Sequence, residues 1–449
     1  MKFRLVLKYL LAILIITVPL YPKFPLISVP GTFVSIRLED FLIALAVIIF
    51  IVVYGKDLLS QKVVKNRFIK YLILYIAASF ISVISAVYLT QTVQLHIGML
   101  HLFRRVEYIS LGLVIYYYLK EYPDDRRFFL GLIFPIIIYA FIYGFGQKNF
   151  SWPIIITQNQ EYSKGVALKW VPGSHINSTF AGHYDLATYL VLFVPLVVSL
   201  FYYEKNIRSK LFYLSVFLAS MWLLVNSASR ISLASYLLAS SLALIFQKKF
   251  KEIIPLVIVT IIFVIFSSNL LTRYNRIFQV ARDIISTEIV PNVRASEESI
   301  RRIVAQPTPT LVPVFEDRST SIRLNVEWPR AARAFLKNPF LGTGFSSITL
   351  ATDNDYLRSL GETGLLGFLT FMLVILEVLR SFYEYIKTRS KNDLEFIVIA
   401  SLLGGFVGVL INAVFIDIFE ASKMAISLWI SIGIGLSITT TKYLQGGHK

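Results

Sequence analysis

A carboxylate and an amide, Asp353 and Asn354, stand directly before a long apolar run in the stretch ATDNDYLRSLGETGLLGF. Ionisable groups at the edge of hydrocarbon are costly and usually mark function. Asp355, Arg358 and Glu362 follow at spacings that let them pair with one another on a helix. Asp353 and Asn354 have no partner at such a spacing. One of them can cap the helix, but a cap alone does not account for the pair.

Arginine is concentrated in the polar stretch 268–352, which contains ten Arg and one Lys. A guanidinium grips phosphate with two parallel hydrogen bonds, whereas an ammonium acts as a point charge. The stretch therefore favours a phosphate-bearing or acidic ligand, with anionic headgroups or its own carboxylates as the alternative partners. Arg323, Glu327 and Arg330 share one face by helical spacing. Pro329 must start or kink that helix.

Two further polar residues lie at the ends of apolar runs. Arg230, in VNSASRIS, is expected at the outer end of a helix, where it either binds an anion or extends toward lipid headgroups. His183, in GSHINSTFAGHYDLATYL, is favoured as a hydrogen-bonded helix-end residue over a catalytic base. Zinc helices carry two His four residues apart, which this pattern lacks, and the chain has no Cys. We expect no metal or other cofactor.

The elements that must position these residues are membrane helices. Of the 449 residues, 56% are hydrophobic and only 16% are charged. Continuous apolar runs long enough to cross a bilayer recur along the chain, which excludes a soluble domain and an alternating β-barrel. The sequence predicts an all-α polytopic protein with about twelve spans in one membrane domain, residues 1–449. The predicted spans are 3–21, 38–54, 68–89, 106–119, 128–146, 184–203, 211–226, 230–246, 253–267, 356–379, 394–414 and 422–440.

Lys and Arg fall on one side of this arrangement. If the spans alternate, the short basic segments 55–70, 120–127 and 380–391 all face the same way. This positive-inside pattern predicts that both termini are cytoplasmic. The net charge of +17 is then mostly a topology signal and does not argue for nucleic acid as a partner. Residues 268–355 become one large extracytoplasmic loop that ends at the Asp353 motif.

The stretch NPFLGTGFSSITLATDNDYLRSLGETGLLGF resembles the signature of the O-antigen ligase and O-antigen polymerase superfamily. That signature is a Pro-x-x-Gly-x-Gly segment, a His-Asn or Asp-Asn pair, a Tyr-Leu, and a Gly-x-x-Gly that opens a span. The pair Ser229–Arg230 also matches the family, as do Arg323 and Trp328 upstream of the motif. The resemblance covers the part of the chain from about residue 170 to about residue 440.

The resemblance implies an all-helical glycosyltransferase of the bacterial cytoplasmic membrane. It would move a glycan from an undecaprenyl-pyrophosphate carrier to a hydroxyl of a glycan, lipid or protein acceptor at the outer face. We predict as catalytic residues Asp353 and Arg230, and as substrate-binding residues Arg323, Arg330, Asn354 and His183. Ligases of this family carry His where this chain has Asp353, so ligase and polymerase both stay open. A lipid-linked oligosaccharide flippase is the alternative, although polar residues gather at one face instead of the midplane.

Overall fold

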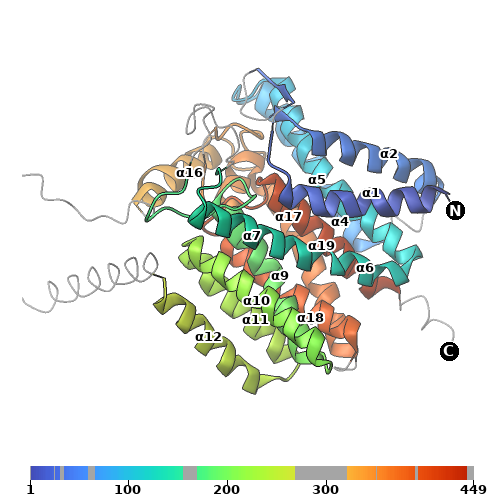
Figure 1. Ribbon diagram of the computed structural model, residues 1–449. Helices are drawn as coiled ribbons and strands as arrows, with labels where there is room; N and C mark the ends of the chain where they lie inside the picture. The colour runs from blue at the N-terminus through green and yellow to red at the C-terminus, as the bar shows by residue number, and fades with distance from the viewer. Residues whose placement is uncertain are drawn as a thin grey trace, which may run out of the picture.

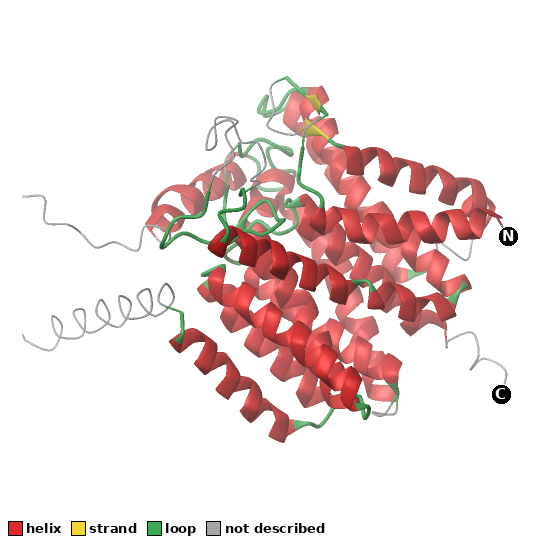
Figure 2. Cartoon of the chain, viewed as in Figure 1, coloured by secondary structure: helices red, strands yellow, loops and turns green. Residues whose placement is uncertain are grey.

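The computed structural model describes residues 2–24, 26–30, 35–58, 66–154, 169–267, 321–349, 351–389 and 393–441. Over this part of the chain the fold is a bundle of helices (Figures 1 and 2). Strand β1 (Ile27–Ser28) pairs antiparallel with β2 (Ser35–Ile36) at one end of the bundle. Most residues of the predicted large loop, 268–320, lie outside the described residues, and so do most of its arginines.

The helices coincide with the predicted apolar spans, because runs without charge satisfy their backbone groups most easily as helix in an apolar surrounding. They are α1 (Lys2–Leu20), α2 (Leu38–Leu58), α4 (Arg67–Tyr88), α5 (Leu95–Glu121), α6 (Arg126–Gly131), α7 (Ile133–Asn149), α9 (His183–Tyr203), α10 (Ile207–Asn226), α11 (Arg230–Phe246), α12 (Ile253–Ile265), α16 (Trp328–Lys337), α17 (Asp355–Thr388), α18 (Leu394–Asn412) and α19 (Ser422–Thr441). Short turns complete the set: η1 (Pro123–Asp125), η2 (Phe250–Glu252) and the π-helical η3 (Arg323–Glu327). Helix α5 begins well before its predicted start.

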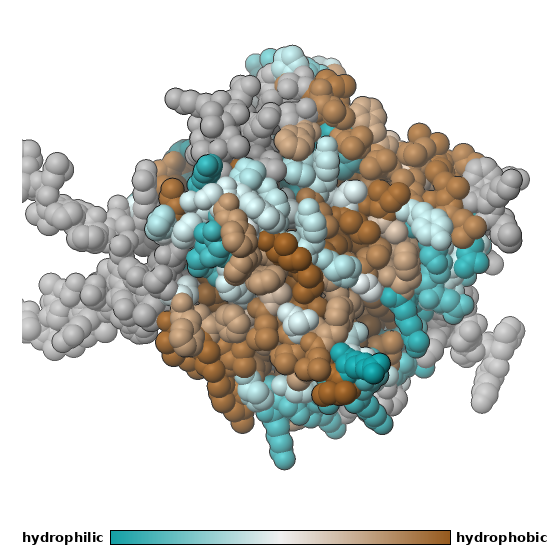
Figure 3. Space-filling model, in the orientation of Figure 1, coloured by the Kyte–Doolittle hydropathy of each residue, from teal (hydrophilic) through white to brown (hydrophobic). Residues whose placement is uncertain are grey.

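Eight helices of the described chain are long and apolar enough to cross a membrane by length and composition. They lie in Leu38–Gly55, Arg67–Tyr88, Pro123–Asn149, His183–Tyr203, Ile207–Asn226, Asp355–Thr388, Leu394–Asn412 and Ser422–Thr440. Large apolar side chains such as Ile48, Ile258 and Phe266 are exposed on the outside, and apolar surface covers much of the face in Figure 3. The chain is thus an all-α, multi-pass membrane protein. Twelve spans and the extracytoplasmic loop remain predictions.

The centre of the bundle is formed by helices that are apolar all round. In α19, 94% of the most apolar window is buried, whereas in the peripheral α2 the share is 28%. Small residues bring the central backbones together: a Cβ on Gly405 of α18 would meet the Leu192 carbonyl oxygen of α9 at 2.2 Å. Close approach of this kind is typical of packed membrane helices. It fixes the relative positions of α9, α11 and α18, whose ends carry the polar site.

The two ends of the bundle are held by different polar contacts. At one end Lys8 of α1 binds Asp125 at 2.7 Å, and Arg126 donates to the Ser437 carbonyl oxygen of α19 at 2.7 Å. At the other end Lys423 donates to two backbone carbonyls, one after α7 and one at the end of α1. The start of α1 and the end of α19 therefore lie at the same end of the bundle, and the start of α17 lies at the opposite end. Which end faces the cytoplasm stays a prediction.

Candidate active site

The site lies where α17 begins, and α17 is broken there. Gly364 has φ +65° and ψ −172° inside the helix, a conformation that is essentially restricted to glycine. The break leaves backbone groups without helical partners. Leu365 N–H donates to the Pro339 carbonyl oxygen at 2.8 Å, and Gly344 N–H donates to the Glu362 carbonyl oxygen at 2.7 Å. The segment NPFLGTG is hydrogen-bonded into the break, which gives the Pro-x-x-Gly-x-Gly spacing a physical reason.

Asp353 precedes α17 and is bound by Arg323. Arg323 donates two hydrogen bonds to Oδ2 of Asp353, from Nε at 2.9 Å and from Nη2 at 2.7 Å. Nη2 also lies 3.3 Å from the hydroxyl oxygen of Tyr184 at the start of α9. Asp353 has φ +48°, a left-handed conformation that costs on the order of 1 kcal/mol and that Asp tolerates better than most residues. Such strain persists only where surrounding contacts over-determine it.

A second carboxylate, Asp417, holds the Asp353 loop by its backbone. Oδ2 of Asp417 accepts the N–H of Thr352 at 2.8 Å, and Oδ1 accepts the N–H of Asn354 at 3.3 Å. The two amides that flank Asp353 are thus bound by one side chain. Asp417 was not predicted, because it comes from the connection between α18 and α19 and belongs to no motif.

Asn354 is the N-cap of α17. Its side-chain oxygen accepts the N–H of Leu357 at 2.9 Å, which satisfies one of the free donors of the first helical turn. The substrate-binding role of Asn354 stays a prediction beside this capping role. The residue acts on the site by fixing where α17 starts.

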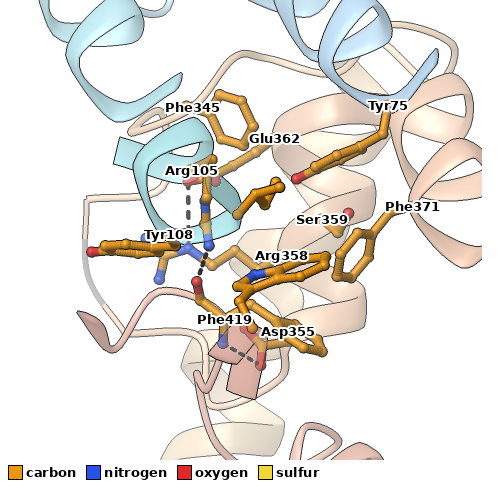
Figure 4. A pocket seen from close by; sticks show the side chains of 12 residues that line it. Tyr75, Arg105, Tyr108, Phe345, Asp355, Arg358, Ser359, Glu362, Phe371 and Phe419 are labelled. Carbon is orange, nitrogen blue, oxygen red and sulfur yellow. Dashed lines mark hydrogen bonds and ion pairs between the residues drawn. The ribbon is translucent and has the colours of Figure 1, made fainter. Parts of the chain in front are cut away.

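Arg358 connects this loop to a buried group of charges behind it. It lies 2.7 Å from Oε2 of Glu420, 3.1 Å from Oδ2 of Asp417 and 3.5 Å from Oε1 of Glu362. Arg105 of α5 binds Glu420 from the other side. Arg105, Arg358 and Glu362 line a cavity of about 30 Å³ (Figure 4). That volume has room for about one water molecule and none for a sugar. We assign the cluster to positioning: it anchors α17 and the α18–α19 connection to α5.

Three polar atoms that follow Arg323 closely in the chain are buried and have no hydrogen-bond partner within the described residues. They are Oε2 of Glu327, Nε1 of Trp328 and Nη1 of Arg330, from η3 and α16. Figure 1 shows α16 at one end of the bundle, and it packs against α17 there. An unsatisfied buried group costs about 1–3 kcal/mol. Three such groups within about one helical turn make this junction of η3 and α16 a candidate for contact with a ligand.

The carboxylates of this site titrate above their ordinary range. Burial raises the pKa of Glu327 to about 7; Asp353 and Asp417 add to the rise, while Arg323 and Arg330 oppose it. Burial also raises the pKa of Asp353; Arg323 opposes that rise and Asp417 adds to it. Desolvation disfavours the charged form of an acid, and a nearby like charge does the same. Perturbed groups of this kind are typical of functional sites.

Arg230 starts α11 at the same end of the bundle. Two residues further, Ser232 accepts a hydrogen bond from Asn412 at 3.0 Å. The next residue, Ala413, accepts the backbone N–H of Asp355 at 2.9 Å. These contacts join the start of α11 to the start of α17 through the end of α18. The structure thereby places Arg230 on the side of the bundle that carries Asp353.

His183 starts α9 within a row of aromatic rings. Its imidazole stacks on that of His175 with centroids 4.1 Å apart, and its centroid lies 4.0 Å from that of Tyr184. The Arg323 guanidinium lies 5.8 Å from the centre of the Tyr184 ring. Tyr184 was missed from sequence, although its position in the first turn of a predicted helix, beside His183, was the available signal. The row leads from the loop before α9 to the Arg323–Asp353 pair.

The arrangement suits an anion and a hydroxyl. Both hydrogen bonds from Arg323 to Asp353 end on Oδ2, and within the described residues Oδ1 accepts none. Nη1 of Arg323 likewise makes no hydrogen bond in this part of the chain. The described residues therefore leave one guanidinium edge and one carboxylate oxygen of this pair without a hydrogen-bond partner. No cluster of three or more metal-ligating side chains occurs among the described residues.

Comparison with known protein families gives a match to the O-antigen ligase family over residues 214–372. The matched segment begins in α10 and ends in α17, and it contains Arg230, Arg323 and Asp353. No curated protein matches the chain.

Proposed function

We propose that this chain, an O-antigen ligase family protein over residues 214–372, acts as a glycan polymerase or ligase at the outer face of the cytoplasmic membrane. The donor is a glycan on undecaprenyl pyrophosphate, and the acceptor is a hydroxyl group. The family match supports a membrane glycan ligase or polymerase in general. The observation that carries the specific proposal is the contact of Arg323 with Asp353, inside the matched segment and at the end that also holds Arg230.

Arginine has a direct task in this reaction. A lipid pyrophosphate leaves with negative charge, and in many enzymes the groups aimed at developing charge lower the barrier more than any others. Arg323 offers its Nη1 edge to a phosphate oxygen while Asp353 holds the plane of its guanidinium. Arg330 offers a buried Nη1 that lacks a partner within the described residues. Arg230 adds a third guanidinium from α11. Three guanidinium groups, each able to form two parallel hydrogen bonds, suit the several oxygens of a pyrophosphate.

Asp353 has the second task, which is to receive the acceptor. Its Oδ1 can accept a hydrogen bond from the acceptor hydroxyl while Oδ2 stays bound to Arg323. One residue pair thus joins the acceptor side of the reaction to the donor side. Reactants held at the right distance and angle react far faster than free ones.

Purified protein in lipid vesicles, supplied with an undecaprenyl-pyrophosphate-linked repeat unit, tests the proposal. New glycosidic bonds together with released undecaprenyl pyrophosphate are the expected result. Movement of the lipid-linked glycan across the vesicle without new bonds would identify a flippase instead. An Asp353→Ala variant that inserts normally and builds glycan at the wild-type rate would remove Asp353 from its role.

A further inference from the structure

Glu327 is a carboxylate of the site, at the end of the turn that begins with Arg323. It is half-buried, its Oε2 is fully buried, and this atom has no hydrogen-bond partner within the described residues. Its neighbours in charge come from four elements: Arg323 of η3, Arg330 of α16, Asp353 before α17 and Asp417 before α19. Neither arginine forms an ion pair with Glu327 among the described residues, whereas Arg323 pairs with Asp353 at 2.7 Å. Charge neutralisation of Arg323 or Arg330 therefore explains poorly why Glu327 stands at this position.

The backbone places Glu327 beside the Arg323–Asp353 pair. Residues Arg323–Glu327 form a π-helical turn, in which the N–H of Trp328 donates to the Arg323 carbonyl oxygen. Pro329 follows and has no N–H to donate, so a regular α-helical bond is absent at this point. Single π turns often occur at functional sites. Here the turn carries Arg323 at its start and Glu327 at its end, and the ring of Trp328 packs near Phe415 with centroids 6.3 Å apart.

The two carboxylates differ in what they can do with a proton. Asp353 accepts two charge-assisted hydrogen bonds from Arg323, and such bonds favour its ionised form. Glu327 accepts none on Oε2 and lies in the field of two other carboxylates. A general base works best when its pKa is near the working pH. The pKa of Glu327, raised to about 7 mainly by burial, meets that condition.

We infer that Glu327 is the general base that takes the proton of the acceptor hydroxyl, an inference that rests on the proposed function. The acceptor oxygen forms a bond to the anomeric carbon of the donor sugar. The bond from that carbon to the pyrophosphate oxygen breaks, and its electron pair leaves with the pyrophosphate. The hydroxyl proton passes to Oε2 of Glu327. Asp353 orients the hydroxyl, and the Nε1 of Trp328 donates to a substrate oxygen next to Glu327.

The rate of transfer as a function of pH tests this role. In the wild type, transfer requires ionised Glu327, so the rate should fall as pH drops through about 7. Glu327→Gln keeps the shape of the side chain and removes the base, so the rate should fall about 10²–10⁴-fold and the acid limb should disappear. Glu327→Asp keeps a carboxylate, and we expect it to retain the acid limb at a lower rate. Glu384→Gln, an exposed residue of α17, is the matched control and should behave as wild type.

The outcomes separate this inference from the proposed function. If the wild type forms glycosidic bonds and Glu327→Gln keeps its rate within a few-fold or keeps the acid limb, Glu327 is not the base and the proposed function stands. If the wild type forms no bonds, both fail. A purely structural role would lower the rate without removing the acid limb.

A second measurement needs no turnover. Infrared difference spectra of the vesicle-bound wild type, recorded against pH, should show a protonated-carboxyl band that titrates near 7 and is missing in Glu327→Gln. A band that is the same in both proteins would overturn the assignment, even if the variant were too unstable for kinetics.

Discussion

Replacing Asp353 with Asn tests the arginine–carboxylate pair directly. Asn has nearly the same shape and is one of the few residues that tolerates the left-handed backbone at φ +48°. The variant keeps an oxygen near Arg323 but removes the charge that fixes the guanidinium. The side chains of Arg323 and Asp353 are only 11% and 24% exposed, so solvent screens their contact little. A hydrogen bond to a charged group contributes about 1.5–3 kcal/mol.

The expected loss in transfer rate is about 10²–10³-fold, the usual effect of removing one contact that stabilises developing charge. Arg323→Lys should cost a similar factor, because an ammonium cannot hold Asp353 with Nε and Nη2 at once. Since the two residues act as a unit, the double variant should be hardly slower than the slower single variant. Asp124→Asn, an exposed residue near the opposite end of the bundle, is the control.

The assay is release of undecaprenyl pyrophosphate from a lipid-linked repeat unit by the wild type, the two single variants, the double variant and the Asp124→Asn control, at equal amounts of folded protein. Strictly additive losses would mean that Arg323 and Asp353 serve independent purposes. A rate for Asp353→Asn within threefold of wild type, on the order of 0.6 kcal/mol, would refute the assignment of this carboxylate.

Three further substitutions test residues that surround or position the Arg323–Asp353 pair. Arg230→Lys keeps the charge and loses the fork, so transfer should fall about tenfold with a higher donor KM, and an unchanged KM would indicate a plain surface charge. Asp417→Ala frees both amides beside Asp353, so kcat should fall about 10²-fold. A rise in donor KM with kcat unchanged would contradict that positioning role. Gly364→Ala should lower the melting temperature, because strain alone costs about 1–3 kcal/mol and the new Cβ would lie 2.4 Å from the Gly342 nitrogen. Gly131→Ala, where nothing lies within 4 Å, should melt as wild type.

Hydropathy predicts the positions of the helices well, because a backbone segment that water does not reach must form its hydrogen bonds within itself. It says less about where a helix extends beyond its apolar part. Helix α5 begins at Leu95 and not near residue 106, and its first turns carry His96, His101 and Arg104. The glycines of the motif show a similar limit. Their spacing indicates close packing, and a Cβ on Gly361 would indeed lie 3.0 Å from a carbonyl oxygen of α16. The break at Gly364 depends on a segment that docks from outside the helix, and spacing does not reveal it.

The motif predicts residue types at the site and misses partners that come from elsewhere. Arg323 and Asp353 were both predicted, and the structure brings them into contact. Tyr184 and Asp417 were not, because each belongs to an element that only tertiary packing brings to the motif. A hydrogen-bonding side chain can also serve several purposes, and the sequence alone does not say which one applies. The oxygen of Asn354 caps α17 in the structure, and the substrate contact predicted for this residue stays a prediction.

The exchange of His for Asp at position 353 has a consistent explanation in its surroundings. An imidazole near pKa 6.5 can both hold a hydroxyl and take its proton, whereas an aspartate has an ordinary value near 3.9. Bound by Arg323, the Asp353 carboxylate is held in one orientation and can serve as a fixed acceptor. A separate group must then titrate, and Glu327 has a pKa of about 7 because burial, Asp353 and Asp417 all raise it. The carboxylate that Arg323 holds in place is thus also one of the causes that raise the pKa of its neighbour Glu327.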